Sequence, residues 1–125
     1  MSTFSVPMEI GDSTGTRFEK VDAFVDSGST FTSVPRELLE RLGIRPRRTV
    51  RVRLADGRVT EKDAGEALIR LQGLEGTSPV IFNEPGESVL LGAVTLESFL
   101  LGVDPVEQRL IPVEGLRLTS METSD

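Results

Sequence analysis

Short runs of alternating apolar and polar residues, each ended by turn-forming residues, constrain the fold of this chain more than any other feature. Alternation with a period of two predicts strands that bury one face. Turn formers at close spacing between such runs favour a mostly-β sandwich or barrel. The strands predicted in this way cover residues 4–10, 17–25, 49–54, 67–71, 79–82 and 109–113, with a further short apolar run at 89–92 and a turn at 73–78.

Two short helices are expected between these strands. Residues 35–42 predict the first helix, with Ser33 as its N-cap and Gly43 at its end. Thr95 is expected to cap the second helix, and Gly102 is expected to end it.

The composition limits the domain organisation and excludes several kinds of site. The 125 residues fit one compact domain, which we place at 1–118, followed by a polar tail at 119–125 that we expect to be frayed. The chain contains neither cysteine nor histidine. A disulfide framework, a zinc or redox site built on cysteine, a histidine-ligated metal and a Ser-His-Asp triad are therefore excluded.

The charge and the distribution of apolar residues bear on partners and location. A net charge of −6 argues against a nucleic-acid-binding protein, which would carry a basic surface. No run reaches the apolar length that a membrane-spanning helix needs, so we expect no membrane partner. Residues 1–5 carry no basic region and no long apolar segment, so we expect no signal peptide and a cytoplasmic protein.

Five small or polar residues follow the second predicted strand directly: Asp26, Ser27, Gly28, Ser29 and Thr30. Burying them in a strand would be costly, so we expect a loop at the strand end. One carboxylate is a poor hydrolytic catalyst at neutral pH, whereas two that hold one proton between them can activate water and protonate a carbonyl oxygen. The chain has one such loop, so this chemistry needs a second copy, which a two-fold dimer supplies.

Residues 23–30 resemble the active-site loop of the retroviral-type, or retropepsin-like, aspartic proteases. The second signature of that family is two apolar residues and a glycine before a helix. Leu90, Leu91 and Gly92, with the predicted helix after them, are similar to it. The order of the two motifs, of the Asp-Gly hairpin between them and of the closing strand also fits that fold, and the resemblance covers roughly residues 4–113.

One departure brings the chain nearer to prokaryotic and cellular members of the family than to viral ones. Viral members pair acidic residues just after the loop with an arginine just after the second glycine. Thr30, Phe31 and Ala93 stand at those positions here, so that ion pair is absent.

The resemblance implies a small closed β barrel with two short helices that functions as a homodimer. It implies an aspartic endopeptidase that hydrolyses an extended peptide or protein substrate with an activated water and needs no cofactor. We expect the strands at 4–10 and 109–113 to build the dimer interface, since both are short and apolar and need a partner edge. The implied site comprises Asp26 of each subunit as the catalytic residue, Ser27, Gly28, Ser29 and Thr30 as support within the loop, Leu90, Leu91 and Gly92 as packing beneath it, and Ala55, Asp56, Gly57 and Arg58 as the flap over the substrate.

Other interpretations remain open at this point. Only Gly57 lends the flap flexibility, and its charged neighbours favour, as an alternative, a dimeric module of the same fold that binds peptides without cutting them. A chance Asp-Ser-Gly loop on an unrelated monomeric β domain is a third possibility. A serine nucleophile would need Lys20 or Lys62 as its base, and neither lies in a recognisable pairing. A metal site is disfavoured because Gly28 stands where a ligand would be wanted.

Arginines gather in one short stretch of this acidic chain. Such a run is most often a solvated face, which we favour. It could instead attract an acidic peptide or an acidic surface of a partner subunit. The residues are Arg45, Arg47, Arg48, Arg51 and Arg53.

Overall fold

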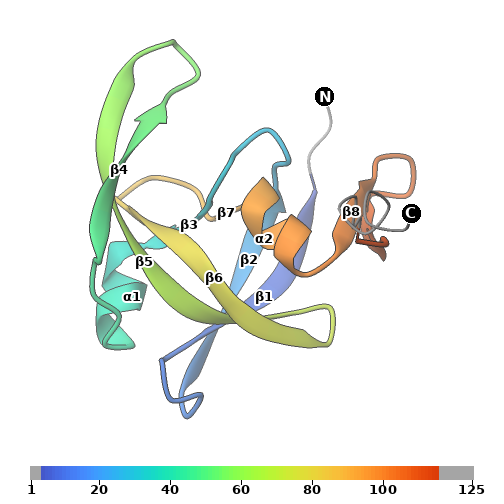
Figure 1. The fold of residues 1–125 in the computed structure, drawn as a ribbon, viewed down its shortest axis with the longest axis horizontal. Helices are drawn as coiled ribbons and strands as arrows, with labels where there is room; N and C mark the ends of the chain where they lie inside the picture. Colours follow the sequence, from blue (N-terminus) through green and yellow to red (C-terminus); the bar gives the residue numbers. More distant parts are fainter. Residues whose placement is uncertain (1–3, 116–125) are drawn as a thin grey trace, which may run out of the picture.

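The computed structural model describes residues 4–115, which form a mostly-β fold with two short helices (Figure 1). The tail predicted at 119–125 lies outside the described residues. In chain order the elements are β1 (Ser5–Gly11), β2 (Phe18–Val25), β3 (Thr32–Pro35), α1 (Arg36–Arg41), β4 (Arg48–Arg53), β5 (Val59–Leu71), β6 (Leu74–Asn83), β7 (Leu90–Leu91), α2 (Ala93–Ser98), β8 (Leu101–Asp104) and β9 (Arg109–Pro112).

The strands of the main sheet close into a ring. Their order is β1-β2-β7-β3-β6-β5-β4, and a further antiparallel pairing joins β1 to β5, with Ile10 opposite Ile69. Six strands therefore form a closed circuit, which agrees with the predicted small closed barrel. β4 lies outside the circuit and pairs only with β5, while β8 and β9 form a separate two-stranded sheet.

The turn predicted at residues 73–78 is wrong in its position and length. β5 and β6 join through Gln72 and Gly73 alone, and both residues have positive φ, 54° and 77°. A two-residue loop of this kind matches the twist of antiparallel strands, so pairing resumes at once with Leu71 opposite Leu74. The predicted strand at 79–82 is thus only the end of a longer one.

The first helix ends as predicted, but it does not begin as predicted. Gly43 has a φ of 74°, and its N–H donates to the carbonyl of Glu40. The N–H of Ile44 donates to the carbonyl of Leu39, which completes a Schellman end. Ser33, predicted as the N-cap, instead lies in β3, and Pro35 precedes the helix without a side-chain cap.

The second helix begins three residues before its predicted position. It begins at Ala93 after Gly92, so Thr95 lies inside its first turn and is not the cap. It ends by Phe99, because Leu100 takes a positive φ of 54° and the chain turns into β8. Gly102, predicted to end the helix, lies in that strand. β3 and β8 were not predicted, because Ser33 was interpreted as a helix cap and Gly102 as a helix end.

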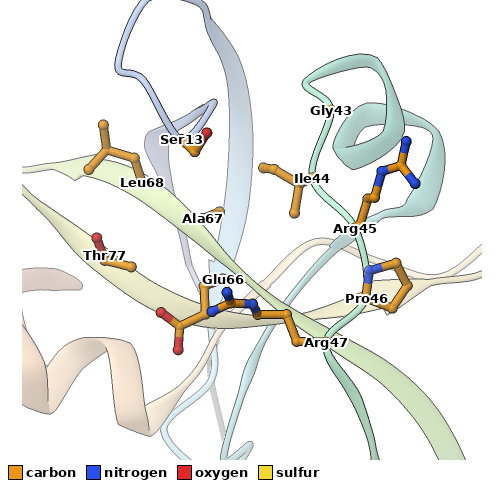
Figure 2. A pocket seen from close by; sticks show the side chains of 10 residues that line it. All are labelled: Ser13, Gly43, Ile44, Arg45, Pro46, Arg47, Glu66, Ala67, Leu68 and Thr77. Carbon is orange, nitrogen blue, oxygen red and sulfur yellow. The ribbon is translucent and has the colours of Figure 1, made fainter.

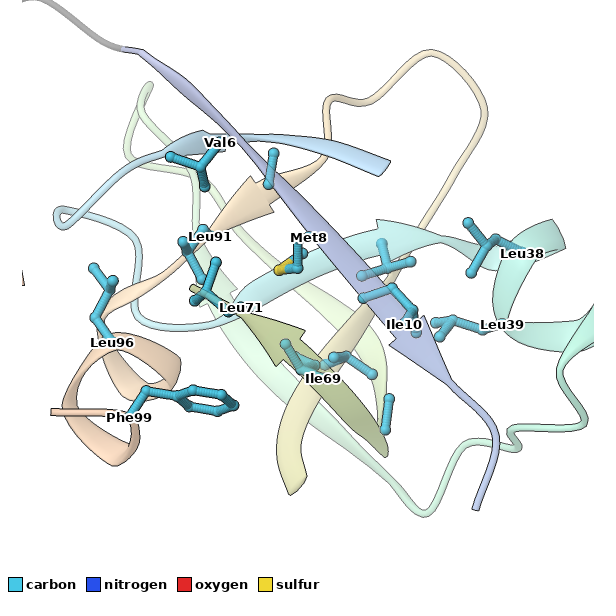
Figure 3. Packing of buried hydrophobic residues seen from close by; sticks show 14 of the residues in the cluster. Val6, Met8, Ile10, Leu38, Leu39, Ile69, Leu71, Leu91, Leu96 and Phe99 are labelled. Carbon is cyan, nitrogen blue, oxygen red and sulfur yellow. The ribbon is translucent and has the colours of Figure 1, made fainter. Parts of the chain in front are cut away.

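One apolar core fills the ring (Figure 3). The inward residues of β1 meet those of β5, α1 closes one end, and α2 packs near β7. Within residues 4–115, neither helix has the length and apolar character that crossing a bilayer requires. The buried side chains labelled in Figure 3 are Val6, Met8, Ile10, Leu38, Leu39, Ile69, Leu71, Leu91, Leu96 and Phe99.

Candidate active site

Asp26 is the first residue after β2, and its carboxylate is held from within its own loop. The N–H of Gly28 donates to Oδ1 at 3.0 Å, and the hydroxyl of Ser29 donates to Oδ2 at 3.0 Å. The backbone turns at the same point, because the N–H of Ser29 donates to the carbonyl of Asp26. Each carboxylate oxygen thus accepts one hydrogen bond from the loop, which fixes the plane of the half-buried carboxylate.

The Leu-Leu-Gly segment lies directly against this loop. β7 runs parallel to β2, with Phe24 opposite Leu90 and Val25 opposite Leu91. The N–H of Asp26 donates to the carbonyl of Leu91 at 3.0 Å. The structure therefore brings together the two motifs that the sequence places far apart.

Gly92 permits the closest approach between the two segments. A Cβ at this position would lie 2.5 Å from the carbonyl carbon and oxygen of Phe31 and 2.9 Å from the carbonyl oxygen of Ser29. Beyond it, the N–H of Ala93 donates to the carbonyl of Ser29 at 2.7 Å, and that of Val94 donates to the carbonyl of Thr30 at 2.9 Å. The first turn of α2 thus uses its free N–H groups to hold the loop.

Three buried hydroxyls support the same loop from behind, and they were missed in the sequence. The hydroxyl of Thr95 lies 2.5 Å from that of Thr32 and 2.7 Å from that of Ser78. Thr32 also accepts a hydrogen bond from the N–H of Gly92 at 3.1 Å. All three side chains are fully buried. The available signal was a polar residue inside an apolar stripe, which for Thr95 was interpreted as a cap.

Two loop residues present their side chains to solvent. Ser27 and Thr30 are exposed, and neither side chain hydrogen-bonds to another residue within 4–115. Phe24, the residue two before Asp26, is 44% exposed. The surface around the carboxylate therefore carries two free hydroxyls and an apolar ring that residues 4–115 leave uncovered.

The predicted flap residues form the tip of the β4–β5 hairpin. The N–H of Leu54 donates to the carbonyl of Arg58 at 2.7 Å, and Gly57 has a φ of 89°. The N–H of Arg58 donates to Asp56 at 3.0 Å, and its Nε donates to the same carboxylate at 2.7 Å. These bonds, the backbone one first, lower the pKa of Asp56. In Figure 1 this tip and the loop after β2 both reach toward the top of the view.

The acidic side chains of the described part of the chain do not form a cluster. Between residues 4 and 115, no group of three or more acidic side chains is placed to hold a metal ion. The carboxylate of Asp26 accepts hydrogen bonds from the N–H of Gly28 and the hydroxyl of Ser29 instead. The chemistry that this arrangement can perform is acid–base chemistry at a single oriented carboxylate.

Comparisons with known proteins agree with this geometry. A family model described as aspartyl protease matches residues 6–104. The simian foamy virus protease is 28% identical, with a TM-score of 0.54 over 75% of this chain and 92% of its own. The retroviral protease-like domain of Ddi1 from Leishmania major is 21% identical, with a TM-score of 0.57 over 93% of this chain and 91% of its own. A retropepsin-like aspartic protease from Rickettsia conorii is 18% identical, with a TM-score of 0.49 over 83% and 89%. No curated protein matches the chain.

Proposed function

This chain belongs to the aspartyl protease family, and we propose that it is an aspartic endopeptidase whose active site forms in a two-fold dimer. Asp26 of each subunit contributes one carboxylate to the site. The observation that carries the proposal is the hydrogen-bonding of Asp26, because the donors from Gly28 and Ser29 orient its carboxylate and leave further acceptor positions on both oxygens. A second carboxylate and a water can use those positions.

The two Asp26 carboxylates share one proton, because two ionised carboxylates only a few ångströms apart would repel each other strongly. The ionised member removes a proton from a water that lies between them. The resulting oxygen nucleophile attacks the scissile carbonyl carbon, while the protonated member gives its proton to the carbonyl oxygen. The C–N bond of the tetrahedral intermediate then breaks as the amine takes a proton from the pair. No covalent enzyme intermediate forms.

The same proposal assigns roles to the exposed loop residues. Ser27 donates across the two-fold axis to the partner loop, which is consistent with its free hydroxyl. Of the two strands predicted to build the dimer interface, β1 is paired on both sides at residues 9–11, so its start is left for a partner, and β9 has one free edge. Asp56, Gly57 and their neighbours at the hairpin tip close over an extended peptide.

The cytoplasmic location expected from the sequence remains a prediction.

A comparison of the wild type with Asp26→Asn over a range of pH tests the proposal. The substitution keeps the shape of the side chain and can keep the bond from the Gly28 N–H. We expect the wild type to cleave a mixed peptide pool fastest at acidic to mildly acidic pH, and the variant to be slower by at least about a hundredfold. The melting temperature of the two proteins, measured in parallel, should be nearly equal.

The enzyme concentration adds a second criterion. Cleavage should fall faster than linearly on dilution, once dimers dissociate. Equal activity of the wild type and Asp26→Asn would overturn the proposal. A dimer that leaves every peptide intact at all pH values would support the non-cleaving module, and a monomer at micromolar concentration would overturn the two-fold dimer. The family match already excludes the chance loop on an unrelated β domain.

A further inference from the structure

The β4–β5 arm carries a concentration of positive charge that the proposed chemistry does not use. Five arginines, which we call the arginine edge, lie within nine residues, and all are exposed. In the part of the chain that the structure describes, none of them forms an ion pair within 4.0 Å, although nine ion pairs form between other residues. The residues are Arg45, Arg47, Arg48, Arg51 and Arg53.

This charge lies along an unpaired backbone. β4 pairs with β5 alone, from Arg48 opposite Ala64 to Arg53 opposite Val59, so its other edge offers free N–H and C=O groups. A free edge can accept an added strand. Arginines on it repel a second copy of the same edge, and the same charges attract an acidic strand. The charge pattern therefore favours an acidic strand on the free edge of β4 over pairing with a second copy of β4.

A groove of about 570 Å³ continues this surface at the base of the arm (Figure 2). Ile44, Ala67 and Leu68 give it an apolar wall, and Arg47 extends over it toward Glu66. The groove contains neither Asp26 nor any residue of its loop. It is a site separate from the one proposed for catalysis.

The segment that borders the groove is held firmly in place. The N–H of Arg47 donates to the carbonyl of Ala64 at 2.8 Å. A Cβ at Gly65 would lie 2.8 Å from the carbonyl oxygen of Arg45, so only glycine allows the segment to approach β5 so closely. The groove and the start of the arginine edge are therefore preformed, and binding there costs little ordering of the protein.

We propose that the groove and the arginine edge dock an extended acidic segment of a protein substrate, at a distance from the scissile bond. One apolar side chain of that segment enters the groove, its backbone continues along β4, and its carboxylates meet the arginines. Describing the partner as a substrate rests on the proposed function, whereas the docking itself does not.

Two carboxylates on this surface lie near arginines without forming an ion pair within 4.0 Å with them. Glu61 lies opposite Arg51 on the neighbouring strand, and Glu66 faces Arg47 across the groove. Arg45 and Arg48 have no such neighbour directly opposite: Ala64 is the partner of Arg48. On this surface the five arginines still outnumber the two carboxylates, although the whole chain has a net charge of −6.

A nucleic acid fits this surface less well than an acidic protein segment does. Residues 45–53 contain no aromatic side chain on which a base could stack, and none lines the groove. The overall negative charge also repels a polyanion at longer range. An oligonucleotide therefore serves as a competing probe in the test.

Direct binding to the Asp26→Asn protein tests the docking without any need for cleavage. The probes are a fluorescein-labelled peptide of alternating Glu and Ser with one central Leu, its Gln-for-Glu counterpart and a labelled single-stranded oligonucleotide, followed by fluorescence anisotropy. Within this background, Arg47→Gln/Arg48→Gln is compared with the matched control Arg17→Gln/Lys20→Gln, which removes two exposed cations from the β1–β2 hairpin.

We expect the Glu peptide to bind more tightly than the Gln peptide, and its affinity to fall as salt is raised. Arg47→Gln/Arg48→Gln should weaken binding of the Glu peptide about tenfold or more, and the control should leave it within about twofold. An equal loss in both variants, no preference for the Glu peptide, or tighter arginine-dependent binding of the oligonucleotide would each overturn the proposal. Absence of proteolysis in the wild type would end the proposed function and leave this binding result standing.

Discussion

The loop that carries Asp26 and the β4–β5 arm extend from the same sheet, yet they satisfy their polar groups in opposite ways. In the loop, residues 26–32, hydrogen bonds to neighbouring segments hold the Asp26 carboxylate, the backbone carbonyls beside α2 and the hydroxyl of Thr32. In the arm, β4 has one strand partner, and the arginine edge forms no ion pair among residues 4–115.

Because of this difference, replacing a polar side chain should have different effects in the two regions. Where the partners of a polar group lie in the same chain and are buried, replacing one leaves the other unsatisfied, and the free energy of unfolding falls. Where the partners are missing, replacement costs the fold little and changes what the surface can bind. Matched substitutions in the two regions test this contrast.

Alanine at Gly92 and at Gly57 should have very different costs. At Gly92 the new Cβ meets backbone atoms of Phe31 and Ser29 at 2.5–2.9 Å, which cannot move without moving the loop. We expect urea denaturation to show a loss of about 3 kcal/mol or more for Gly92→Ala. Nothing lies within 4 Å at Gly57, so Gly57→Ala should cost only about 1 kcal/mol, from the positive φ. Similar losses for both variants would contradict the contrast.

Valine at Thr95 and at Thr49 provides a matched pair of isosteric changes. Thr95→Val removes the hydroxyl that joins Thr32 and Ser78, and leaves both in a buried site with one partner fewer. We expect it to lower the free energy of unfolding by about 1–3 kcal/mol. Thr49 is exposed on β4, and Thr49→Val should change stability by no more than about 0.5 kcal/mol. A neutral Thr95→Val would show that the network does not support the loop.

Glutamine at Glu87 should have a pH-dependent effect at the base of the arm. Burial acts to raise the pKa of Glu87, but hydrogen bonds from Lys62 at 2.8 Å and from the N–H of Glu84 outweigh it and lower the pKa. Because folding lowers this pKa, the stabilisation is present above the ordinary pKa of glutamate and is lost as pH falls through the lower folded-state value.

We therefore expect Glu87→Gln to be less stable than the wild type by about 0.5 kcal/mol at pH 7, a figure already reduced for solvent screening. The difference should shrink as pH falls below the ordinary pKa of glutamate, about 4.3, and should be small at about pH 2. Thermal unfolding at both pH values measures it, and Glu97→Gln, an exposed change on α2, is the control. A difference that persists in acid would show that the charge on Glu87 is not its source.

The smallest expected effect on stability belongs to the arginine edge. Arg47→Gln/Arg48→Gln should change the free energy of unfolding by no more than about 0.5 kcal/mol, since neither side chain has an acidic partner within residues 4–115. Thermal unfolding tests this directly. A large loss would mean that the arginines stabilise the arm itself, and the contrast between the two regions would fail.

Several features could be predicted because their signals are local. The strand that leads to Asp26, the turn of the chain at Gly43 and the short Leu-Leu-Gly run each depend on neighbours in the sequence, and the predicted family is confirmed. The position of α2 and the turn at Gln72 could not be predicted in the same way. Thr95 has the chemistry of a cap and serves as a buried hydrogen-bonding group, and glutamine is an unusual residue at positive φ.

By itself, the sequence determined which segments alternate, where a carboxylate follows a strand, and that neither cysteine nor histidine can take part in the chemistry. Only the tertiary structure decided that Thr32 and Thr95, 63 residues apart, share a hydrogen bond behind the loop, and that β4 has a free edge beside a groove. Alternation is a property of adjacent residues, whereas partners in a closed ring depend on how distant segments meet, and no local pattern records that.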